Sequence, residues 1–147
     1  LEADDALGIH TTKHTGNIIV SPDKDMRQIP GKLYNLDEVF TITKEAGAQW
    51  HLIQTCAGDQ TDGYSGIPGI GVKRAEALFN KEGYSWKTVE KAFIDKGLTK
   101  EDALLNARLA RILTVDDYDF KKQQPKYWTP SSSYEINNGA GFEDEIA

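Results

Sequence analysis

The chain has 147 residues, of which 39% are hydrophobic, and this predicts one domain with a subdomain and a modest apolar core. Its single cysteine, Cys56, excludes an internal disulfide and is typical of a reducing compartment, so we expect a cytoplasmic protein. The formal net charge of −6 argues against a generally basic surface, and no apolar run approaches the length of a membrane span, so we expect no membrane partner.

The chain opens with an acidic cluster that contains Glu2, Asp4 and Asp5. Residues 4–13 are expected to form a helix that begins at this cluster. Carboxylates in a first turn complement the positive end of the helix dipole, so the cluster alone indicates a capped helix rather than a ligand set.

A second acidic pair follows a short apolar run. Residues 18–20 are β-branched and predict a buried strand, which Pro22 should end because proline cannot continue a central ladder. Asp23 and Asp25 would then lie at the carboxyl end of the strand, where open α/β sheets place their active sites. Taken alone, the pair is also a common turn composition. Residues 33–35 are expected to form another short strand.

A third region joins two carboxylates to a glycine-rich turn. Residues 43–57 predict a helix capped by Thr43. Asp59 and Asp62 follow, and on a helical turn this spacing would let them face the same way and share a cation. Residues 66–71, GIPGIG, would expose backbone N–H groups that can hold a phosphate. Such turns are common before helices, so this one alone is a weak signal.

Three more helices and a polar tail are expected after the turn. The helices are predicted at residues 72–80, 86–96 and 99–113. Ser85 caps the second, and Thr99 with Asp102 resembles a capping arrangement for the third. From residue 121 the chain is polar, and Tyr127 and Trp128 are its candidates for docking.

The three acidic regions together indicate a metal site. They offer seven carboxylates: Glu2, Asp4, Asp5, Asp23, Asp25, Asp59 and Asp62. Oxygen ligands without a supporting set of His or Cys favour magnesium or manganese over zinc. Acidic residues for metal beside amides for phosphate indicate metal-dependent chemistry on a nucleic-acid backbone. Lys73 and Arg74 are expected to contact phosphate, with a merely solvated helix face as the alternative.

The order of three motifs resembles the 5′-nuclease superfamily. EADD at residues 2–5 is followed by SPDKD at 21–25 and GDxxDGYSGIPGIGVKRA at 58–75. This superfamily contains flap endonucleases and the 5′-exonuclease domains of bacterial DNA polymerases, and the resemblance is greatest to the small 5′-3′ exonuclease of T-odd coliphages. It extends through WHLIQT at 50–55 and ARIL at 110–113, and it covers roughly residues 1–128.

The resemblance implies an α/β fold in three regions. Residues 1–57 would be the C-terminal part of a PIN-like nuclease core with a few short strands. Residues 58–120 would form an α-helical helix–hairpin–helix (helix–three-turn–helix) subdomain that binds DNA, and residues 121–147 a flexible tail. Family members carry a further segment of strands and helices ahead of the EADD motif, so we expect this chain to be a fragment.

The resemblance also implies hydrolysis of DNA phosphodiester bonds from or near a 5′ end with two divalent metals. Family carboxylates matching Glu2, Asp4 and Asp5 help to hold one metal, and those matching Asp23, Asp25, Asp59 and Asp62 help to hold or position the second. Among these residues, Asp4, Asp25 and Asp59 are assigned as catalytic.

The glycine-rich turn is expected to grip duplex phosphates. The assigned DNA-binding residues are Gly66, Gly69, Ile70, Gly71, Lys73 and Arg74. The resemblance implies that the backbone of Ile67 and Ile70 holds a potassium ion. Tyr64 lies in the loop before this turn and is the aromatic side chain to test for DNA contact.

The expected partner is DNA with a 5′ end or flap, and no obligate protein partner is evident. The alternative is a non-catalytic module that binds duplex DNA through the glycine-rich turn. A calcium-stabilised protein without a nucleic-acid partner is a weaker hypothesis, because the glycine and terminal acid of an EF-hand do not follow Asp23 and Asp25 in register.

Overall fold

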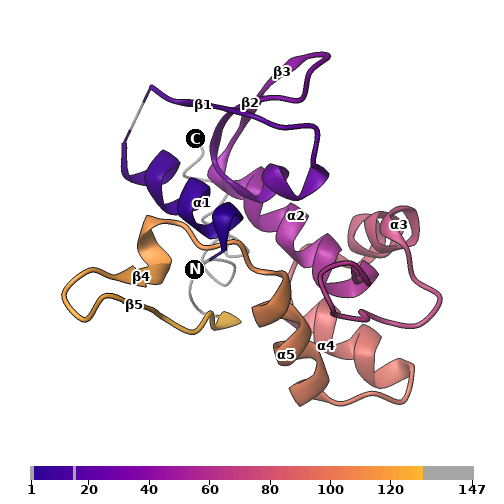
Figure 1. Ribbon diagram of the computed structural model, residues 1–147. Coiled ribbons are helices and arrows are strands. Elements are labelled where there is room, and N and C mark those ends of the chain that lie inside the picture. Colours follow the sequence, from indigo (N-terminus) through magenta and orange to yellow (C-terminus); the bar gives the residue numbers. More distant parts are fainter. Residues whose placement is uncertain (1, 15, 131–147) are drawn as a thin grey trace. The chain divides into compact units, whose positions relative to one another are not determined.

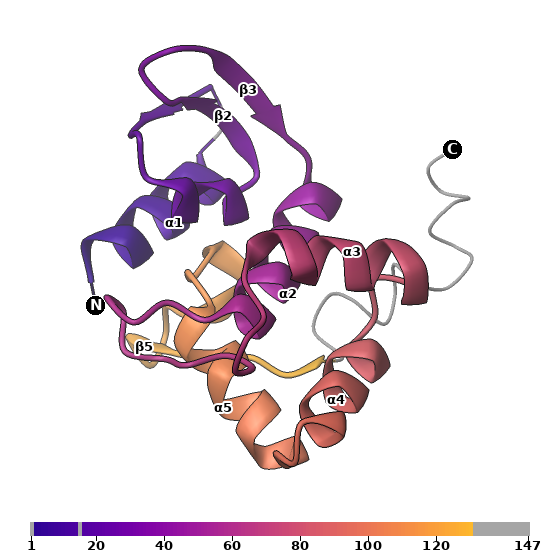
Figure 2. The ribbon, with the colours of Figure 1, turned by 90° about the vertical axis from the view of Figure 1, so that its right-hand side faces the viewer.

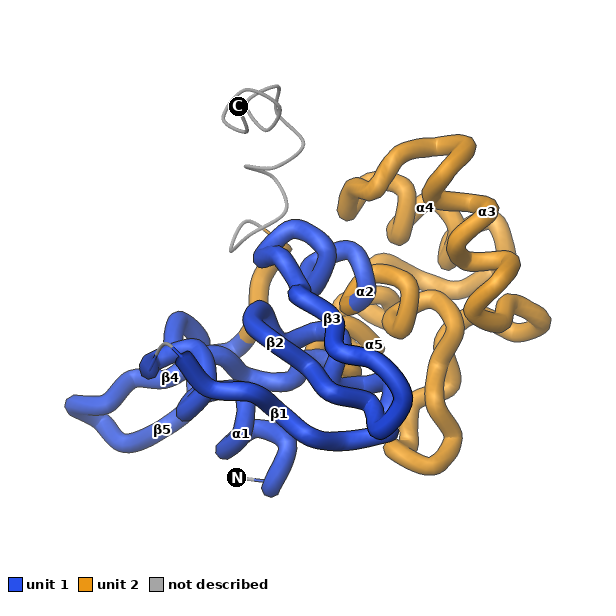
Figure 3. Tube along the Cα trace, turned by 90° about the horizontal axis from the view of Figure 1, so that it is seen from above, with its two compact units in different colours: residues 1–50, 111–127 blue, residues 51–110, 128–147 orange. Residues whose placement is uncertain are grey.

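The computed structural model describes residues 2–14 and 16–130 of the chain, which form a mixed α/β structure with five α-helices and a few short strands. The chain divides into two compact units, which are drawn in different colours in Figure 3. Unit 1 contains residues 1–50 and 111–127, and unit 2 contains residues 51–110 and 128–147. The expected α/β class is therefore confirmed. The division expected from the sequence, into residues 1–57, 58–120 and 121–147, stays a prediction. It describes functional regions, whereas the two units are defined by contacts between residues.

Unit 1 contains a helix at its start, a small sheet and a hairpin late in the chain (Figure 1). Its elements are α1 (Ala3–Lys13), β1 (Ile18–Val20), the 3₁₀ helix η1 (Lys24–Gln28), β2 (Gly31–Tyr34), β3 (Val39–Ile42), the 3₁₀ helix η2 (Val115–Asp117), β4 (Tyr118–Asp119) and β5 (Gln124–Pro125). The sheet order is β1-β2-β3. β1 runs parallel to β2 with Ile19 opposite Leu33, and β2 runs antiparallel to β3 with Leu33 opposite Phe40.

One face of the three-stranded sheet covers the core of unit 1. Side chains of successive strand residues alternate between faces, so Ile19 and Leu33 point inward while their neighbours are exposed. The core cluster is completed from outside the sheet, and its buried members are Ile19, Met26, Ile29, Leu33 and Ile112. Phe40 and Ile42 of β3 pack against this cluster.

Helix α2 (Lys44–Ala57) begins in unit 1 and ends in unit 2. Thr43 caps it, because its Oγ1 accepts a hydrogen bond of 3.0 Å from the Ala46 N–H. Gly47 lets the start of α2 approach η1 closely, since a Cβ at this position would collide with the carbonyl oxygen of Gln28. The first turns of α2 and the 3₁₀ helix that follows β1 are thus held backbone to backbone.

Unit 2 is helical (Figure 2). After α2 it contains α3 (Val72–Glu82), α4 (Trp86–Asp95) and α5 (Lys100–Ala110), and α4 packs against α5. Its buried apolar side chains include Leu52, Ile53, Ile67, Phe79, Val89 and Phe93. Trp128 joins them with its ring edge-on to Trp86 and to His51, at centroid distances of 5.4 and 4.9 Å.

Most predicted elements are confirmed, with shifts of one or two residues at several ends. α1, β1, α2 and α4 lie where the sequence placed them, and Ser85 accepts the Thr88 N–H as the cap of α4. The Thr99–Asp102 capping arrangement is also present, with reciprocal hydrogen bonds of 2.9 and 3.1 Å. α3 runs two residues further than predicted.

The structure differs from the expected elements in three places. The strand β3 was not predicted, and the short strand expected at residues 33–35 is present as β2 but begins earlier, at Gly31. Helix α5 ends at Ala110 and does not reach residue 113. The helix stops there because the next backbone N–H groups bond elsewhere: Ile112 donates to Gln28 Oε1 at 2.9 Å, and Leu113 donates to Asp5 Oδ1 at 3.0 Å.

The range expected to be a polar tail contains structure at its start. β5 lies within it, and Trp128 is buried as the docking prediction required, while Tyr127 is 83% exposed. Residues 131–147 of that range lie outside the described residues. Among the described residues, no helix is both long enough and apolar enough to cross a membrane.

Candidate metal centre

The loop after β1 positions two aspartates by local hydrogen bonds. Ser21 Oγ accepts the Asp23 N–H at 3.1 Å, and Asp23 Oδ1 in turn accepts the Asp25 N–H at 2.9 Å. This second bond makes Asp23 the cap of η1 and fixes both residues at the carboxyl end of the strand, as the sequence predicted. Asp25 is only 7% exposed, because its neighbours in η1, Met26 and Gln28, are part of the buried interior.

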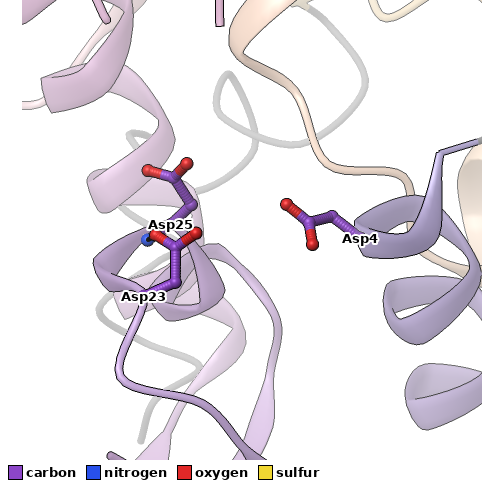
Figure 4. A group of neighbouring side chains, drawn as sticks. All are labelled: Asp4, Asp23 and Asp25. Carbon is purple, nitrogen blue, oxygen red and sulfur yellow. Dashed lines mark hydrogen bonds between the residues drawn. The ribbon is translucent and has the colours of Figure 1, made fainter. Parts of the chain in front are cut away.

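Asp4 approaches this pair from a different part of unit 1. It lies in the first turn of α1 and is half-buried. One carboxylate oxygen from each of Asp4, Asp23 and Asp25 lies within 4.8 Å of the other two. Figure 4 shows the Asp4 carboxylate pointing from α1 toward the two carboxylates of the η1 loop. We call these three residues the unit 1 triad.

The unit 1 triad fits a hard divalent cation. Its donors are all carboxylate oxygens, which magnesium, manganese and calcium prefer. Metal–oxygen bonds are about 2.0–2.6 Å long, so two oxygens on opposite sides of one ion are about 4–5 Å apart. The spacing of the triad therefore suits a shared ion with small adjustments of the side chains.

The other two carboxylates of the first acidic cluster lie differently. Asp5 Oδ1 accepts the Leu113 N–H, so this side chain ties α1 to the segment after α5. Glu2 is exposed at the start of α1, where its side chain makes no capping bond. Sequence reasoning gave Asp5 a role with metal and missed its structural bond, because the partner is far away in the chain.

Asp59 and Asp62 lie in a closed loop of unit 2. Asp59 and Tyr64 pair as an isolated antiparallel bridge, with backbone hydrogen bonds of 2.8 and 3.2 Å. Inside this bridge, Asp59 Oδ1 accepts the N–H groups of Thr61 and Asp62 at 2.9 and 3.3 Å. Carboxylate oxygens of Asp59 and Asp62 lie within 4.8 Å of each other. The prediction that this spacing brings the pair together is confirmed, although a bridged turn replaces the expected helical one.

The glycine-rich turn of residues 66–71 is a type II turn that opens α3. Ile70 N–H donates to the Ile67 carbonyl at 3.1 Å, Pro68 takes the first central position and Gly69 has φ +80 at the second. Gly71 caps α3 with φ −97, so the left-handed conformation is required at Gly69 and not at Gly71. A Cβ at Gly69 or Gly71 would meet nothing within 4 Å, so both leave open space beside the backbone.

The turn is anchored by a residue that sequence reasoning missed. Asn106 of α5 is buried and accepts the Gly66 N–H through its Oδ1 at 2.8 Å, while its amide group donates to Asp102. Ile67 N–H donates to the Cys56 carbonyl at 2.8 Å at the end of α2. One feature of the sequence could have indicated this role: Asn106 is the single polar residue among the buried positions of α5, where the others are Ala103, Ala107 and Ala110.

Three side chains near the turn were candidates for contact with DNA, and the structure places them differently. Arg74 donates through Nη1 to the Gly69 carbonyl at 3.0 Å, so part of its guanidinium already holds the turn. Tyr64, the aromatic side chain chosen for a test of DNA contact, is 4% exposed, so its ring is buried in this structure. Lys73 is exposed on the first turn of α3.

The single cysteine, Cys56, is buried and unreactive. Cys56 is fully buried at the end of α2, and this burial raises the pKa of its thiol to about 12. The thiolate is therefore scarce at neutral pH, so Cys56 is a structural residue and not a nucleophile.

The chain is similar in sequence to proteins named as nucleases. The exodeoxyribonuclease of Enterobacteria phage T3 is 29% identical over 90% of the chain and 56% of the phage protein. The exonuclease of Escherichia phage T7 is 29% identical over 88% of the chain and 56% of its own length. A 5′-3′ exonuclease of Streptomyces coelicolor is 33% identical over 56% of the chain and 33% of its own length. The chain thus spans about half the length of the phage relatives.

These similarities support the resemblance that the motifs indicated, and the chain is similar to the 5′-nuclease family over most of its length. No protein-family model matches the chain.

Proposed function

We propose that the chain is part of a divalent-metal-dependent 5′-3′ exodeoxyribonuclease, which hydrolyses DNA phosphodiester bonds at or near a 5′ end. The observation that carries the proposal is the convergence of Asp4, Asp23 and Asp25 from two separate segments of unit 1. Exposed acidic groups also cluster without a metal, but here one of the three carboxylates is buried. The names of the phage and bacterial relatives support the same activity.

The proposed ligands form two groups in the chain. The resemblance implied that Asp23 and Asp25 belong to the second ion. Because Asp4 lies close to both, we propose instead that these three residues hold one ion, with Glu2 and Asp5 as further ligands of the first acidic cluster. Asp59 and Asp62 supply the carboxylates of unit 2. Two bound magnesium or manganese ions would activate the attacking water and stabilise the leaving oxygen. Within this set, Asp4, Asp25 and Asp59 are the proposed catalytic residues.

The turn and α3 are proposed to serve as the helix–hairpin–helix element that holds duplex DNA. The proposed contacts are Gly66, Gly69, Ile70, Gly71, Lys73 and Arg74. The open space beside Gly69 and Gly71 supports close approach of a phosphate to the backbone. A potassium ion is proposed at the carbonyls of Ile67 and Ile70, because a carbonyl that already accepts one hydrogen bond keeps a second lone pair.

The proposal is tested by manganese binding and by cleavage of a 5′-labelled duplex. Asp25→Asn is expected to weaken manganese binding at least tenfold in calorimetric titration, which is about 1.4 kcal/mol, and to abolish cleavage. Asp95→Asn, at the exposed end of α4, makes the same chemical change outside both acidic groups and should leave both readouts unchanged. Equal manganese affinity in the two variants contradicts the metal site.

The same experiment separates the enzyme from the alternative. A wild-type chain that binds the duplex with manganese present and leaves it intact would support a non-catalytic DNA-binding module. Because the chain spans about half of the phage relatives, the cleavage measurement is repeated with any longer parent polypeptide.

A further inference from the structure

An arginine in η1 is held by two aromatic rings. The guanidinium carbon of Arg27 lies 5.5 Å from the ring centroid of Phe40 in β3 and 5.3 Å from that of Trp50 in α2. Both distances are within the range of a cation–π contact. All three side chains are half-buried, so the rings restrict the guanidinium and remove part of its water.

The hydrogen-bonding edge of this guanidinium is unused within the described part of the chain. Among residues 2–14 and 16–130, the Arg27 side chain takes part in no hydrogen bond or ion pair. A guanidinium has five N–H donors in its plane, and contact with ring faces does not engage them. The other arginines that the fold uses are bonded: Arg111 to Asp117, Arg108 to the Trp128 carbonyl and Arg74 to the Gly69 carbonyl.

The position of Arg27 relates it to the unit 1 triad. It follows Asp25 by two residues on the same 3₁₀ helix, so their Cα atoms are at most about 7 Å apart. The close approach of Gly47 to Gln28 fixes the first turns of α2 against this helix, and Trp50 lies one turn further along. The backbone of Arg27 is therefore close to that of Asp25, one of the proposed metal ligands, and its side chain, restrained by the two rings, offers donors for an oxyanion.

We propose that Arg27 binds a phosphate of the DNA strand and positions that strand at the unit 1 triad. This inference rests on the proposed function, because it assigns a phosphodiester as the ligand. An arginine suits the role because its charge is permanent and its planar fork matches two phosphate oxygens. A tether between η1, β3 and α2 would need only the ring contacts and would leave the salt dependence of DNA binding unchanged.

The test is fluorescence anisotropy of a labelled duplex with calcium in place of magnesium, over a series of salt concentrations. Arg27→Gln is expected to weaken binding and to reduce the log–log salt slope by about one unit, because one phosphate contact contributes about 0.9. Lys91→Gln removes the same charge from the exposed face of α4 and should change neither quantity. Circular dichroism checks that each variant is folded.

A second variant keeps the inference testable if Arg27→Gln does not fold. Arg27→Lys retains the charge and the aliphatic stem but loses the fork, so we expect the slope to persist while affinity falls several-fold. Wild-type affinity in folded Arg27→Lys, or a wild-type slope in folded Arg27→Gln, overturns the phosphate contact.

Failure of this inference is distinguishable from failure of the proposed function. Manganese titration and cleavage by the wild-type chain report on the metal site without reference to Arg27. Normal cleavage with an unchanged slope in the variant would make Arg27 a tether only. A wild-type chain that binds no duplex overturns both proposals.

Discussion

The two units hold their acidic residues in opposite ways. In unit 1 the triad combines Asp4 of α1 with two residues of the η1 loop, about twenty positions along the chain. In unit 2 Asp59 and Asp62 belong to one loop, closed by a bridge between Asp59 and Tyr64. The first arrangement exists only when distant segments are packed together, whereas the second is fixed largely by its own backbone.

This difference predicts where substitutions act at a distance. The unit 1 triad depends on bonds made far from it, such as Asp5 to Leu113 and Gln28 to Ile112. The unit 2 loop depends on the glycines that let its backbone close and on the Asn106 anchor. Stability and metal binding should therefore be coupled in unit 1 through long-range contacts and in unit 2 through backbone conformation.

The largest effect is expected from Gly66→Ala. Gly66 has φ +63, and a Cβ would collide with backbone atoms of Cys56, Ala57 and Gly58. We expect the free energy of unfolding to fall by about 3 kcal/mol or more, measured by urea denaturation, because both strain and overlap oppose the new side chain. Gly63→Ala is the matched control: its φ is +83, but nothing lies within 4 Å of the added Cβ, so only about 1 kcal/mol of strain is expected. Equal losses would show that space around Gly66 does not matter.

A smaller effect is expected at Asp5, where two substitutions separate its roles. Asp5→Ala removes the acceptor for the Leu113 N–H and should lower the free energy of unfolding by about 1–2 kcal/mol. Asp5→Asn keeps an Oδ1 acceptor and should stay within about 0.5 kcal/mol of wild type. If Asp5 is also a metal ligand, Asp5→Asn weakens manganese binding despite normal stability. Unchanged manganese affinity in this variant would restrict Asp5 to its structural bond.

The smallest effects on folding are expected at the start of α3. Gly71→Val adds a side chain where φ is already negative and space is open, so the protein should fold and bind duplex DNA less tightly, equally on different sequences.

Lys73→Ala should lower the log–log salt slope by about one unit, as one lost phosphate contact requires. Lys87→Ala on the exposed side of α4 is the control. Anisotropy titrations that give wild-type affinity and slope in both variants would reduce the turn to a structural element.

The sequence predicted what short-range chemistry decides. The caps at Thr43, Ser85 and Thr99, the closeness of Asp59 to Asp62 and the strand end before Asp23 all follow from residues a few positions apart. These interactions depend on residues that are neighbours in the chain, so they can be predicted from a single sequence.

The sequence did not predict contacts between segments that are far apart in the chain. Nothing in the sequence around Asp5 and Asn106 indicates that they bond to Leu113 and Gly66. β3 was missed because a four-residue strand with two exposed positions is defined mainly by its pairing with β2. The buried state of Tyr64 likewise depends on the surroundings of the loop and not on its own residues.

Both units take a late residue of the chain into their interior, which matters during synthesis on the ribosome. Ile112 completes the core of unit 1, and Trp128 inserts beside His51 and Trp86 in unit 2. Because translation proceeds from the N-terminus, the elements built first must wait for residues 111–128 before either interior is filled. A shortened version ending at residue 110 should therefore expose apolar surface in both units, whereas the 147-residue chain should not, and binding of a hydrophobic dye would distinguish them.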